Sequence, residues 1–429
     1  MEGLFMATMP HILILGTNFA GLTTARLIRE RAGENVRITC IDQKPYLTFI
    51  PNIPIEVWNN NNPEAELHLP FIKFLDRDDI DFIQGKVNEV DVERKTVSFK
   101  PVERAGSANE NISYDFLVIA LGNKLAFDEI EGFGKYGHTF TDTYYGDKIR
   151  RYLHEGGYKG GPVAIGSDLF VQGKSEKLPD VPVAEAACEG PPVEVSFSMA
   201  DWLKKKGLGG AEKVTMFTPA EVIAEDAGQQ ILDQLLPMVR EMGFGYKSNT
   251  RGIKRIYKDG IEFLDGSSLE AELKIIFPNW KAHDFLRDLP ISDDQGFIIT
   301  DMYMRNPDYP EVFAVGDAAS ITVPKLGSLG HLEAEVLSKV LGREVGGFQP
   351  SEPIDPLKFK LICMGDMGGH KGFYMHTDEW WGGKTSILKM GYTPHMLKMG
   401  FKAMYYTLGG KIPGWGLPLS EGIADHSFV

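Results

Sequence analysis

The stretch that most restricts the fold of this chain is HILILGTNFAGLTTARLI, residues 11–28. An apolar run leads into a glycine-containing turn and then into a segment with apolar residues at helical spacing. In a strand–turn–helix unit of this kind, the first glycine makes the tight turn, the second lets the backbone approach a pyrophosphate, and the third lets the helix pack on the strand. Gly16 and Gly21 hold the first and third places, whereas Asn18 holds the second. The stretch predicts a nucleotide-binding unit, with a plain strand–helix turn as the alternative.

The next segment strengthens the nucleotide prediction. VRITCID (36–42) is a predicted second strand that ends in Asp42, where a carboxylate can accept hydrogen bonds from a ribose. Cys40 lies inside this strand and is predicted to pack in the core.

Two later segments indicate a flavin. YDFLVIALGNKL (114–125) is a predicted strand followed by a turn similar to the ATG-type crossover of flavoproteins with two dinucleotide-binding domains. PEVFAVGDAAS (310–320) resembles the second flavin motif of that class, in which Asp317 would hold the ribityl chain. The alternative role for Asp317 is capping of the next helix. FAD is favoured over FMN, because the Gly16 turn and Asp42 address an adenosine diphosphate half.

The predicted fold is α/β, with two Rossmann-like dinucleotide-binding domains (glutathione-reductase-like) and a C-terminal amphipathic-helix membrane-binding region. A chain of 429 residues favours two or three domains. The predicted boundaries are 1–125 with 300–345 for the FAD-binding domain, 126–299 for the second domain, and 346–429 for the C-terminal region. A formal net charge of −14 argues against nucleic-acid binding. The N-terminal segment lacks a basic n-region, so no signal peptide is expected.

The second domain is predicted to have lost its NADH site. In GGPVAIGSDLFVQGKSEKLPD (160–180), Gly166 is followed by Asp168, and no further glycine occurs before Gly173. An aspartate at this place would repel a pyrophosphate. The alternative is a degenerate turn that still binds NADH.

Two of the three cysteines stand beside Gly- or Pro-rich turns. Cys188 lies in AEAACEGPPVEVSF (184–197), and Cys363 is predicted to end an apolar strand in LICMGDMGGHKGFY (361–374). Three cysteines are too few for a secreted disulfide framework, so redox or nucleophilic chemistry is the expected use. The pattern suits a thiol pair at a flavin, although two unrelated buried thiols would show the same spacing.

Five collinear motifs carry a resemblance to a known family. They are CEGPPVE (188–194), FIPNIP (49–54), PKLG (324–327), CMGD (363–366) and HMLKMGF (395–401). They resemble the C-x-G-P-P-x-E, F-x-P-x-x-P, P-K-T-G, C-x-x-D and H-x-x-K-x-x-F segments of the sulfide:quinone oxidoreductases. That family is close kin of the flavoprotein subunit of flavocytochrome c sulfide dehydrogenases.

The resemblance implies a membrane-associated enzyme that oxidises sulfide to sulfur or polysulfide and passes electrons through FAD to a membrane quinone. Hydrosulfide would open a sulfur bridge between Cys188, which keeps the sulfur, and Cys363, which passes electrons to the flavin. Glu194 would move protons in the sulfide pocket. Gly327, at a helix N-terminus, and Lys398 would stabilise negative charge on the reduced flavin.

The motifs and the resemblance together predict a set of site residues, with no metal ligand among them. The predicted FAD-binding residues are Gly16, Phe19, Ala20, Gly21, Asp42, Gln43, Pro51, Val87, Ala120, Gly122, Asp317, Gly327 and Lys398. The predicted quinone contacts are Phe373 and Tyr374.

One departure from the family concerns a third cysteine after the crossover. The corresponding segment, YGHTFTDTYYG (136–146), contains none. Non-covalent FAD is therefore predicted, and the family's usual polysulfide-release route is in doubt.

The C-terminal tail suggests a lipid surface as a partner. No Asp or Glu occurs from Trp380 to Ser420. In 394–408 the helical spacing puts Lys398 and Lys402 on one side, near head groups, and the apolar residues on the other: Met396, Leu397, Met399, Phe401, Ala403, Met404 and Leu408. Lys398 cannot serve both the head groups and the flavin, and the resemblance favours the flavin. Trp415 would be a further interfacial anchor. A peripheral, monotopic protein of the cell membrane is predicted; a core-packed terminal helix is the alternative, and a homo-oligomer stays open.

Three other functions share these features. A type II NADH:quinone dehydrogenase would use NADH and tolerate loss of Cys188. A sulfide:quinone oxidoreductase-like flavoprotein could have altered or lost sulfide activity. A non-catalytic redox partner would turn over no donor.

Overall fold

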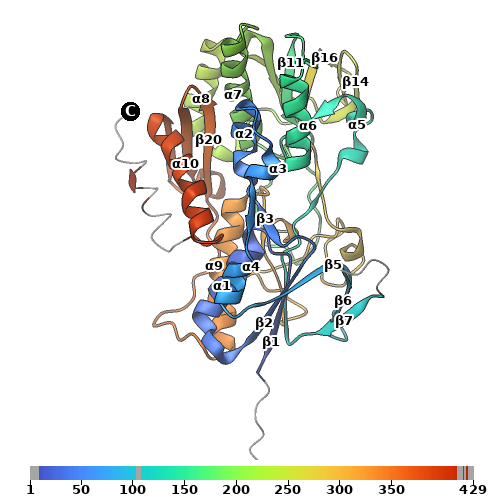
Figure 1. Ribbon diagram of the computed structural model, residues 1–429, viewed down its shortest axis with the longest axis vertical. Helices are drawn as coiled ribbons and strands as arrows, with labels where there is room; N and C mark the ends of the chain where they lie inside the picture. Colours follow the sequence, from blue (N-terminus) through green and yellow to red (C-terminus); the bar gives the residue numbers. More distant parts are fainter. Residues whose placement is uncertain (1–8, 103–107, 413–418, 420–421, 424–429) are drawn as a thin grey trace, which may run out of the picture.

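The computed structural model describes residues 9–102, 108–412, 419 and 422–423 of the chain (Figure 1). Among the described residues, two larger, mainly parallel sheets are accompanied by two three-stranded antiparallel sheets and two short strand pairs. None of the helices within these ranges is long and apolar enough to cross a membrane.

The first sheet has the strand order β19-β8-β1-β2-β5-β6-β7. Its strands are β1 (His11–Leu15), β2 (Arg37–Asp42), β5 (Asp81–Asp91), β6 (Thr96–Pro101), β7 (Glu110–Ser113), β8 (Phe116–Ile119) and β19 (Val312–Ala314). The strands from β19 to β5 are parallel, and β6 and β7 extend the sheet antiparallel. Strand β1 is apolar, and its residues 12–15 are fully buried. Helix α1 (Phe19–Ala32) packs on β1 and β2, and α9 (Gly327–Glu344) packs on α1.

The second sheet is parallel throughout, in the order β10-β17-β11-β12-β13. Its strands are β10 (Gly137–His138), β11 (Val163–Ser167), β12 (Val214–Phe217), β13 (Gly245–Lys247) and β17 (Leu273–Phe277). Its longer helices are α6 (Thr143–His154), α7 (Gly190–Lys206) and α8 (Gln229–Glu241). A small antiparallel sheet follows with β14 (Ile253–Tyr257), β15 (Gly260–Phe263) and β16 (Ser268–Glu270).

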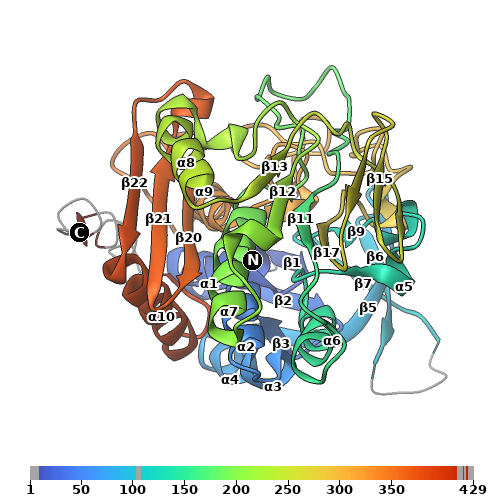
Figure 2. The ribbon, with the colours of Figure 1, turned by 90° about the horizontal axis from the view of Figure 1, so that it is seen from above.

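The C-terminal region is an antiparallel sheet of β20 (Leu361–Gly368), β21 (Lys371–Thr377) and β22 (Ser386–Gly391), followed by α10 (Tyr392–Thr407). In Figure 2 these three strands lie side by side, with α10 across their ends. Strand β20 packs on α7, and α10 packs on β20 and β21. This region therefore joins the second sheet to the first without forming a separate body.

Short elements complete the described chain. The helices are α2 (Ile53–Trp58), α3 (Pro63–Glu66), α4 (Ile72–Arg77) and α5 (Phe133–Tyr136); the strand pairs are β3 (Tyr46–Thr48) with β4 (His68–Pro70) and β9 (Lys124–Leu125) with β18 (Trp280–Lys281).

Several local predictions can be compared with these elements. The strand–turn–helix unit at residues 11–28 is confirmed, β2 ends at Asp42, and Cys40 is fully buried inside it. The prediction that Cys363 ends its strand is wrong. Strand β20 continues to Gly368, because the residues after Cys363 pair with β21.

Candidate active site

The turn between β1 and α1 requires glycine at two positions. Gly16 has φ +93°, and a Cβ on it would lie 2.3 Å from the carbonyl oxygen of Ala120. A Cβ on Gly21 would lie 1.9 Å from the carbonyl oxygen of Gly16. Asn18, at the place of the second glycine, is exposed, and its side chain makes no capping hydrogen bond. The close approach of β1, β8 and α1 therefore depends on the first and third positions only.

Asp42 closes the same turn at the end of β2. Its Oδ2 accepts hydrogen bonds from the backbone N–H of Thr17 at 2.7 Å and from the Thr17 hydroxyl at 3.0 Å. Its Oδ1 accepts the N–H of Lys44 at 3.0 Å. A half-buried carboxylate held at this place can also accept hydrogen bonds from a ribose.

The two later flavin motifs meet in space. Asn123, which follows the crossover glycine Gly122, donates a hydrogen bond from Nδ2 to Asp317 at 2.9 Å. Burial raises the pKa of Asp317, and the nearby ammonium of Lys325 opposes that rise. Burial lowers the pKa of Lys325 to about 8, and its Nζ lies 4.0 Å from the centre of the Phe297 ring. Residues 122–123, 317 and 325 therefore form one polar cluster at the carboxyl ends of β8 and β19.

Asn52 is a further polar group that the sequence did not single out. It lies in FIPNIP and is fully buried, and neither its Oδ1 nor its Nδ2 has a hydrogen-bond partner among the described residues. Buried amides in native proteins nearly always have partners, so this side chain fits a bound polar ligand. Together with the Gly16 turn, Asp42 and Asp317, Asn52 makes the residues present compatible with FAD. Its only sequence signal was its place inside a motif predicted to flank the flavin.

The remaining predicted FAD-binding residues take several environments. Phe19 begins α1 and makes ring contacts with Phe49, His331 and Tyr405, with centroids 5.5–6.0 Å away. Gly327 begins α9 as predicted. The others are Ala20, Val87 and Ala120, which are buried, Gly122, which is half-buried, and Gln43 and Pro51, which are exposed.

The two cysteines predicted to react come together at the start of α7. Cys188 lies directly before Glu189, the N-cap residue of α7. Cys363 lies in β20, which packs on α7. A Cβ on Gly190, the first residue of α7, would lie 3.2 Å from the Cys363 sulfur. Both side chains are free thiols that influence each other electrostatically. Burial raises the pKa of both, that of Cys363 to about 12.

A buried ion pair lies next to Cys363. The ammonium of Lys398, on α10, donates to Glu194 Oε1, on α7, and the same oxygen accepts the N–H of Asp366 at 3.0 Å. Asp366 Oδ1 in turn lies 2.9 Å from Nδ1 of His395. Burial raises the pKa of Glu194 even though Lys398 opposes the rise. Glu194 also raises the pKa of Cys363, whereas Lys398 lowers it.

The position of the α10 lysines corrects one prediction. Lys398 is 2 % exposed, and Lys402 forms a 2.8 Å ion pair with Glu56 of α2. The prediction that Lys402 faces lipid head groups is therefore wrong, because the buried carboxylate of Glu56 holds this lysine. Lys398, for which the resemblance favoured the flavin over head groups, is paired with Glu194. Trp415, the predicted anchor, lies outside the described residues.

The residues predicted to sandwich the quinone are buried in β21. Phe373 is 2 % exposed and Tyr374 is fully buried. Phe373 lies against Gly365, where a Cβ would be 2.1 Å from its ring. Their role toward a quinone stays a prediction.

The carboxyl end of β11 is covered by its own chain. Residues 168–187 fold back as a hairpin in which Leu169 pairs with Ala186 and the N–H of Phe170 bonds Glu185 O at 2.7 Å. Asp168 does not point to an open turn: its Oδ1 accepts the N–H groups of Ile253 at 2.8 Å and of Leu169 at 2.9 Å.

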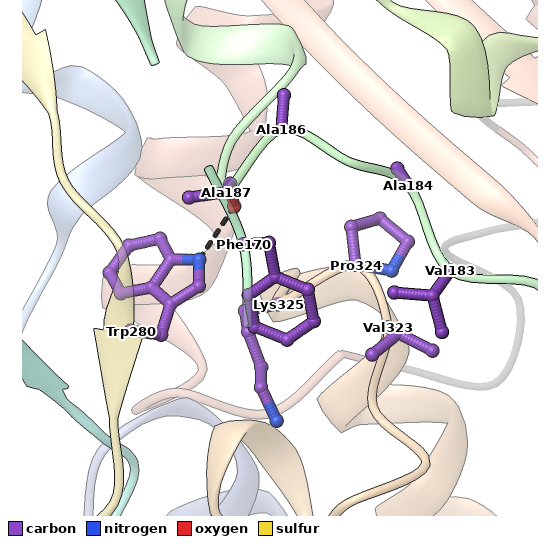
Figure 3. A pocket seen from close by; sticks show the side chains of 9 residues that line it. All are labelled: Phe170, Val183, Ala184, Ala186, Ala187, Trp280, Val323, Pro324 and Lys325. Atoms are coloured by element: carbon purple, nitrogen blue, oxygen red, sulfur yellow. Dashed lines mark hydrogen bonds between the residues drawn. The ribbon is translucent and has the colours of Figure 1, made fainter. Parts of the chain in front are cut away.

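The underside of this hairpin encloses only a small cavity of about 10 Å³, room for about one water molecule. Figure 3 shows its lining, in which Trp280 donates from its indole nitrogen to Ala187 O at 2.6 Å. The lining residues are Phe170, Val183, Ala184, Ala186, Ala187, Trp280, Val323, Pro324 and Lys325. The hairpin therefore packs closely on the segment that carries Lys325.

Comparisons with known proteins agree with this arrangement. The pyridine nucleotide-disulphide oxidoreductase family model matches residues 10–155. The sulfide-quinone reductase of Aquifex aeolicus is 23% identical over 418 residues, covering 92% of this chain and 90% of the relative. The mitochondrial sulfide:quinone oxidoreductase of Mus musculus is 24% identical, covering 77% of this chain and 70% of the relative.

The solved structures give the same result for the fold. The sulfide:quinone oxidoreductase of Aquifex aeolicus superposes with a TM-score of 0.81 at 22% identity, covering 97% of this chain and 96% of that one. NDH2 of Plasmodium falciparum, solved in complex with NADH, gives a TM-score of 0.67 at 15% identity, covering 97% of each chain. The fold is thus the α/β fold of the pyridine nucleotide-disulphide oxidoreductases, and the resemblance of this chain to the sulfide:quinone oxidoreductases is confirmed.

Proposed function

We propose that this protein is an FAD-dependent sulfide:quinone oxidoreductase that oxidises sulfide at Cys188 and Cys363. The observation that carries the proposal is the meeting of these two thiols at the start of α7, from segments far apart in the chain. The relatives named sulfide-quinone reductase support the same function over most of the chain.

The reaction begins from the oxidised form of the two thiols, a disulfide between Cys188 and Cys363; forming it releases two protons and two electrons, for which a quinone is the final acceptor. Hydrosulfide attacks the Cys188 sulfur, a new S–S bond forms there, and the bond to Cys363 breaks. Cys363 leaves with the electron pair as a thiolate, and Cys188 keeps the sulfur as a persulfide. When bound, FAD supplies a two-electron acceptor between Cys363 and a quinone.

The groups around Cys363 regulate its charge. Lys398 favours the thiolate that forms on bond cleavage, and Glu194 disfavours it. Because burial raises the pKa of Glu194, this carboxyl can hold a proton nearer neutral pH than an exposed glutamate does. When Glu194 holds a proton, the ammonium of Lys398 can balance the negative charge of the Cys363 thiolate, so the net charge of the buried site stays small.

Non-covalent FAD is part of the proposal. Segment 136–146 contains no cysteine, and it runs from α5 through β10 into α6 in the second domain. The FAD would be held by the Gly16 turn, Asp42 and Asp317.

The exposed side of α10 is the surface we assign to the membrane. The residues on this side of the helix are exposed and uncharged: Tyr392, Met396, Gly400, Ala403 and Thr407. Met396 is 70 % exposed, an unusual value for a large apolar side chain. A helix of this kind can lie in the interface of a bilayer, where a quinone is available.

An NADH:quinone dehydrogenase is the competing function, because several relatives are described as NADH dehydrogenase-like proteins, among them one of Mycobacterium tuberculosis at 24% identity. The hairpin 168–187 disfavours it, since chain occupies the end of β11 where a dinucleotide would approach.

One anaerobic experiment separates the two functions. Sulfide and NADH are added in turn to the purified holoenzyme while the flavin absorption band is followed. We expect rapid bleaching by sulfide and none by NADH. Bleaching by NADH alone would overturn the proposal in favour of the dehydrogenase.

A further inference from the structure

Two buried carboxyl groups lie beside Cys188 and take no part in the chemistry described above. Glu189 directly follows Cys188 and is 3 % exposed. Asp226, in a short 3-10 turn at Glu225–Ala227, is 2 % exposed. Carboxyl groups are almost never buried to this degree without a partner or a function.

The hydrogen bonding of Glu189 is incomplete. Its Oε2 accepts the backbone N–H of Ala224, a residue with φ +60°. Its Oε1 is buried and has no hydrogen-bond partner among the described residues. A carboxyl oxygen in this situation is more stable with a proton than with a negative charge.

The groups facing Glu189 come from several elements. Asp226 and Glu225 act on it from the 3-10 turn, and Tyr246 of β13 lies close enough to feel its charge. On its own segment Glu189 acts on the Cys188 thiol more strongly than any other charged group does, followed by Asp226. Cys363 and Asp317 also act on Cys188.

We propose that Glu189 and Asp226 form a carboxyl pair beside Cys188 that takes up the proton released when sulfide adds its sulfur to Cys188. Two buried carboxylates that feel each other cannot both be ionised cheaply, so at least one proton stays on the pair. Burial and the Glu225 charge raise the pKa of Asp226 to about 7, and burial together with Asp226 raises that of Glu189. Near neutral pH the pair can therefore both accept and return a proton.

The addition of sulfur to Cys188 releases a proton, and the Glu189–Asp226 pair is the group that can accept it. This step rests on the function proposed above. Sulfide that enters the buried site as neutral hydrogen sulfide must first lose one proton to become the hydrosulfide that attacks. The hydrosulfide sulfur then bonds to Cys188, the Cys188–Cys363 bond breaks, and Cys363 leaves with the electron pair. One proton in all is therefore released as the persulfide forms. The Glu189–Asp226 pair takes up this proton, so that no new charge accumulates beside the buried sulfur.

The test measures the ionisation of Cys188 without sulfide. In Cys363→Ser holoenzyme the remaining thiols are Cys40 and Cys188, and thiolate absorbance is titrated against pH in the ultraviolet. Adding Glu189→Gln removes a charge that opposes the thiolate, so the Cys188 midpoint should fall by about one pH unit or more. Asp226→Asn should shift it in the same direction and serves as the second variant if the first fails to fold.

The matched control is Glu185→Gln, the same change at an exposed glutamate of the preceding hairpin, which should leave the midpoint in place. Equal midpoints in all proteins, or no thiolate at any pH in either carboxyl variant, would overturn the pair's role.

A second measurement follows flavin reduction by sulfide against pH in protein that keeps both cysteines. The Glu189→Gln protein should lose an ionisation near neutral pH that wild type and Glu185→Gln retain. Absence of bleaching in wild type would instead refute the proposed function. The thiolate titration would still show whether the Glu189–Asp226 pair acts on Cys188.

Discussion

The chain uses two strand–turn–helix units in opposite ways. Between β1 and α1 only residues 16–18 intervene, and the turn leaves the start of α1 next to Asp42. Between β11 and α7 the chain inserts residues 168–189, which cover the strand end and bring Cys188 to the helix. The first unit keeps the geometry that suits a pyrophosphate, whereas the second has Cys188 and Cys363 near the start of its helix.

The difference shows that two strand–turn–helix units on parallel sheets can differ mainly in the connection between strand and helix. Strand β11 stays fully buried, paired with β12 and β17, so the scaffold does not depend on the ligand. The two prolines at the start of α7 lack N–H groups, which removes donors that a phosphate would need. The specificity of the second unit therefore lies in its connection and not in its strands.

The largest expected effect is the loss of flavin reduction by sulfide when a cysteine of the second unit is replaced. Cys363→Ser should leave FAD bound but lower the rate of flavin reduction by sulfide at least about a thousandfold, because the leaving thiolate is gone. Cys188→Ser should do nearly the same. Stopped-flow reduction under anaerobic conditions measures both, with Cys40→Ser as the matched control. Wild-type rates in the two variants would refute the disulfide mechanism.

Gly16→Ala should damage the first unit in a different way. The new methyl group would meet the backbone of Ala120, and φ +93° is unfavourable for alanine, so we expect a cost of more than about 2 kcal/mol and weak FAD retention. Bound flavin per chain after gel filtration is the measurement. Gly134→Ala, at a glycine with open space around it, is the control. Full FAD occupancy of the Gly16 variant would show that the turn is not the cofactor site.

The sequence predicted the first unit better than the second. Gly16, Gly21 and Asp42 follow a pattern whose spacing reflects backbone geometry, so the structure has them where expected. Asp168 also lies at the expected strand end, but its carboxylate bonds to Ile253, a residue far along the chain. No local pattern reports a hairpin that folds back on its own strand.

The buried carboxyls were missed for a related reason. Glu189 occupies an unspecified position of the cysteine motif, and Asp226 comes from a turn that carries no motif. Only the tertiary fold brings them together. In α10 the helical spacing put Met396 on the side away from Lys398, and Met396 is exposed. It could not show that Glu194 draws Lys398 inward, or that Phe401, predicted to face lipid, packs against Phe49 and Tyr405.

Asp226→Asn should change the pH dependence of stability. The folded state binds a proton on Asp226 more tightly than the unfolded chain, because its pKa rises from 3.8 to about 7. The contribution of protonated Asp226 to the free energy of unfolding is thus fully present below about pH 4 and is lost as the pH rises through 7. Relative to wild type, the free energy of unfolding of the variant should rise by about 2.5 kcal/mol between pH 5 and pH 8. Urea unfolding at both pH values tests this, and an equal offset at both would contradict it.

Met396→Glu should weaken membrane binding with little effect on the cysteines. The side chain is 70 % exposed on α10, so a charge there costs the fold little but opposes insertion into the acyl boundary. We expect about a tenfold fall in liposome co-sedimentation. Met242→Glu, at another exposed methionine, should bind liposomes like wild type. If Met396→Glu also does, the exposed face of α10 is not the membrane surface.

The smallest expected effect concerns the residue that breaks the glycine pattern of the first unit. Asn18 is exposed, has φ −84° and makes no side-chain capping bond, so Asn18→Gly removes no observed contact. Glycine at a helix cap costs only a few tenths of a kcal/mol relative to asparagine. We therefore expect FAD affinity within about threefold of wild type, measured by flavin fluorescence on dilution. A loss as large as that of Gly16→Ala would mean that the Asn18 side chain itself contacts the cofactor. The first unit would then depend on a side chain as well as on its backbone to bind the cofactor. In that respect it would resemble the second unit, in which the side chain of Cys188 is the proposed functional group.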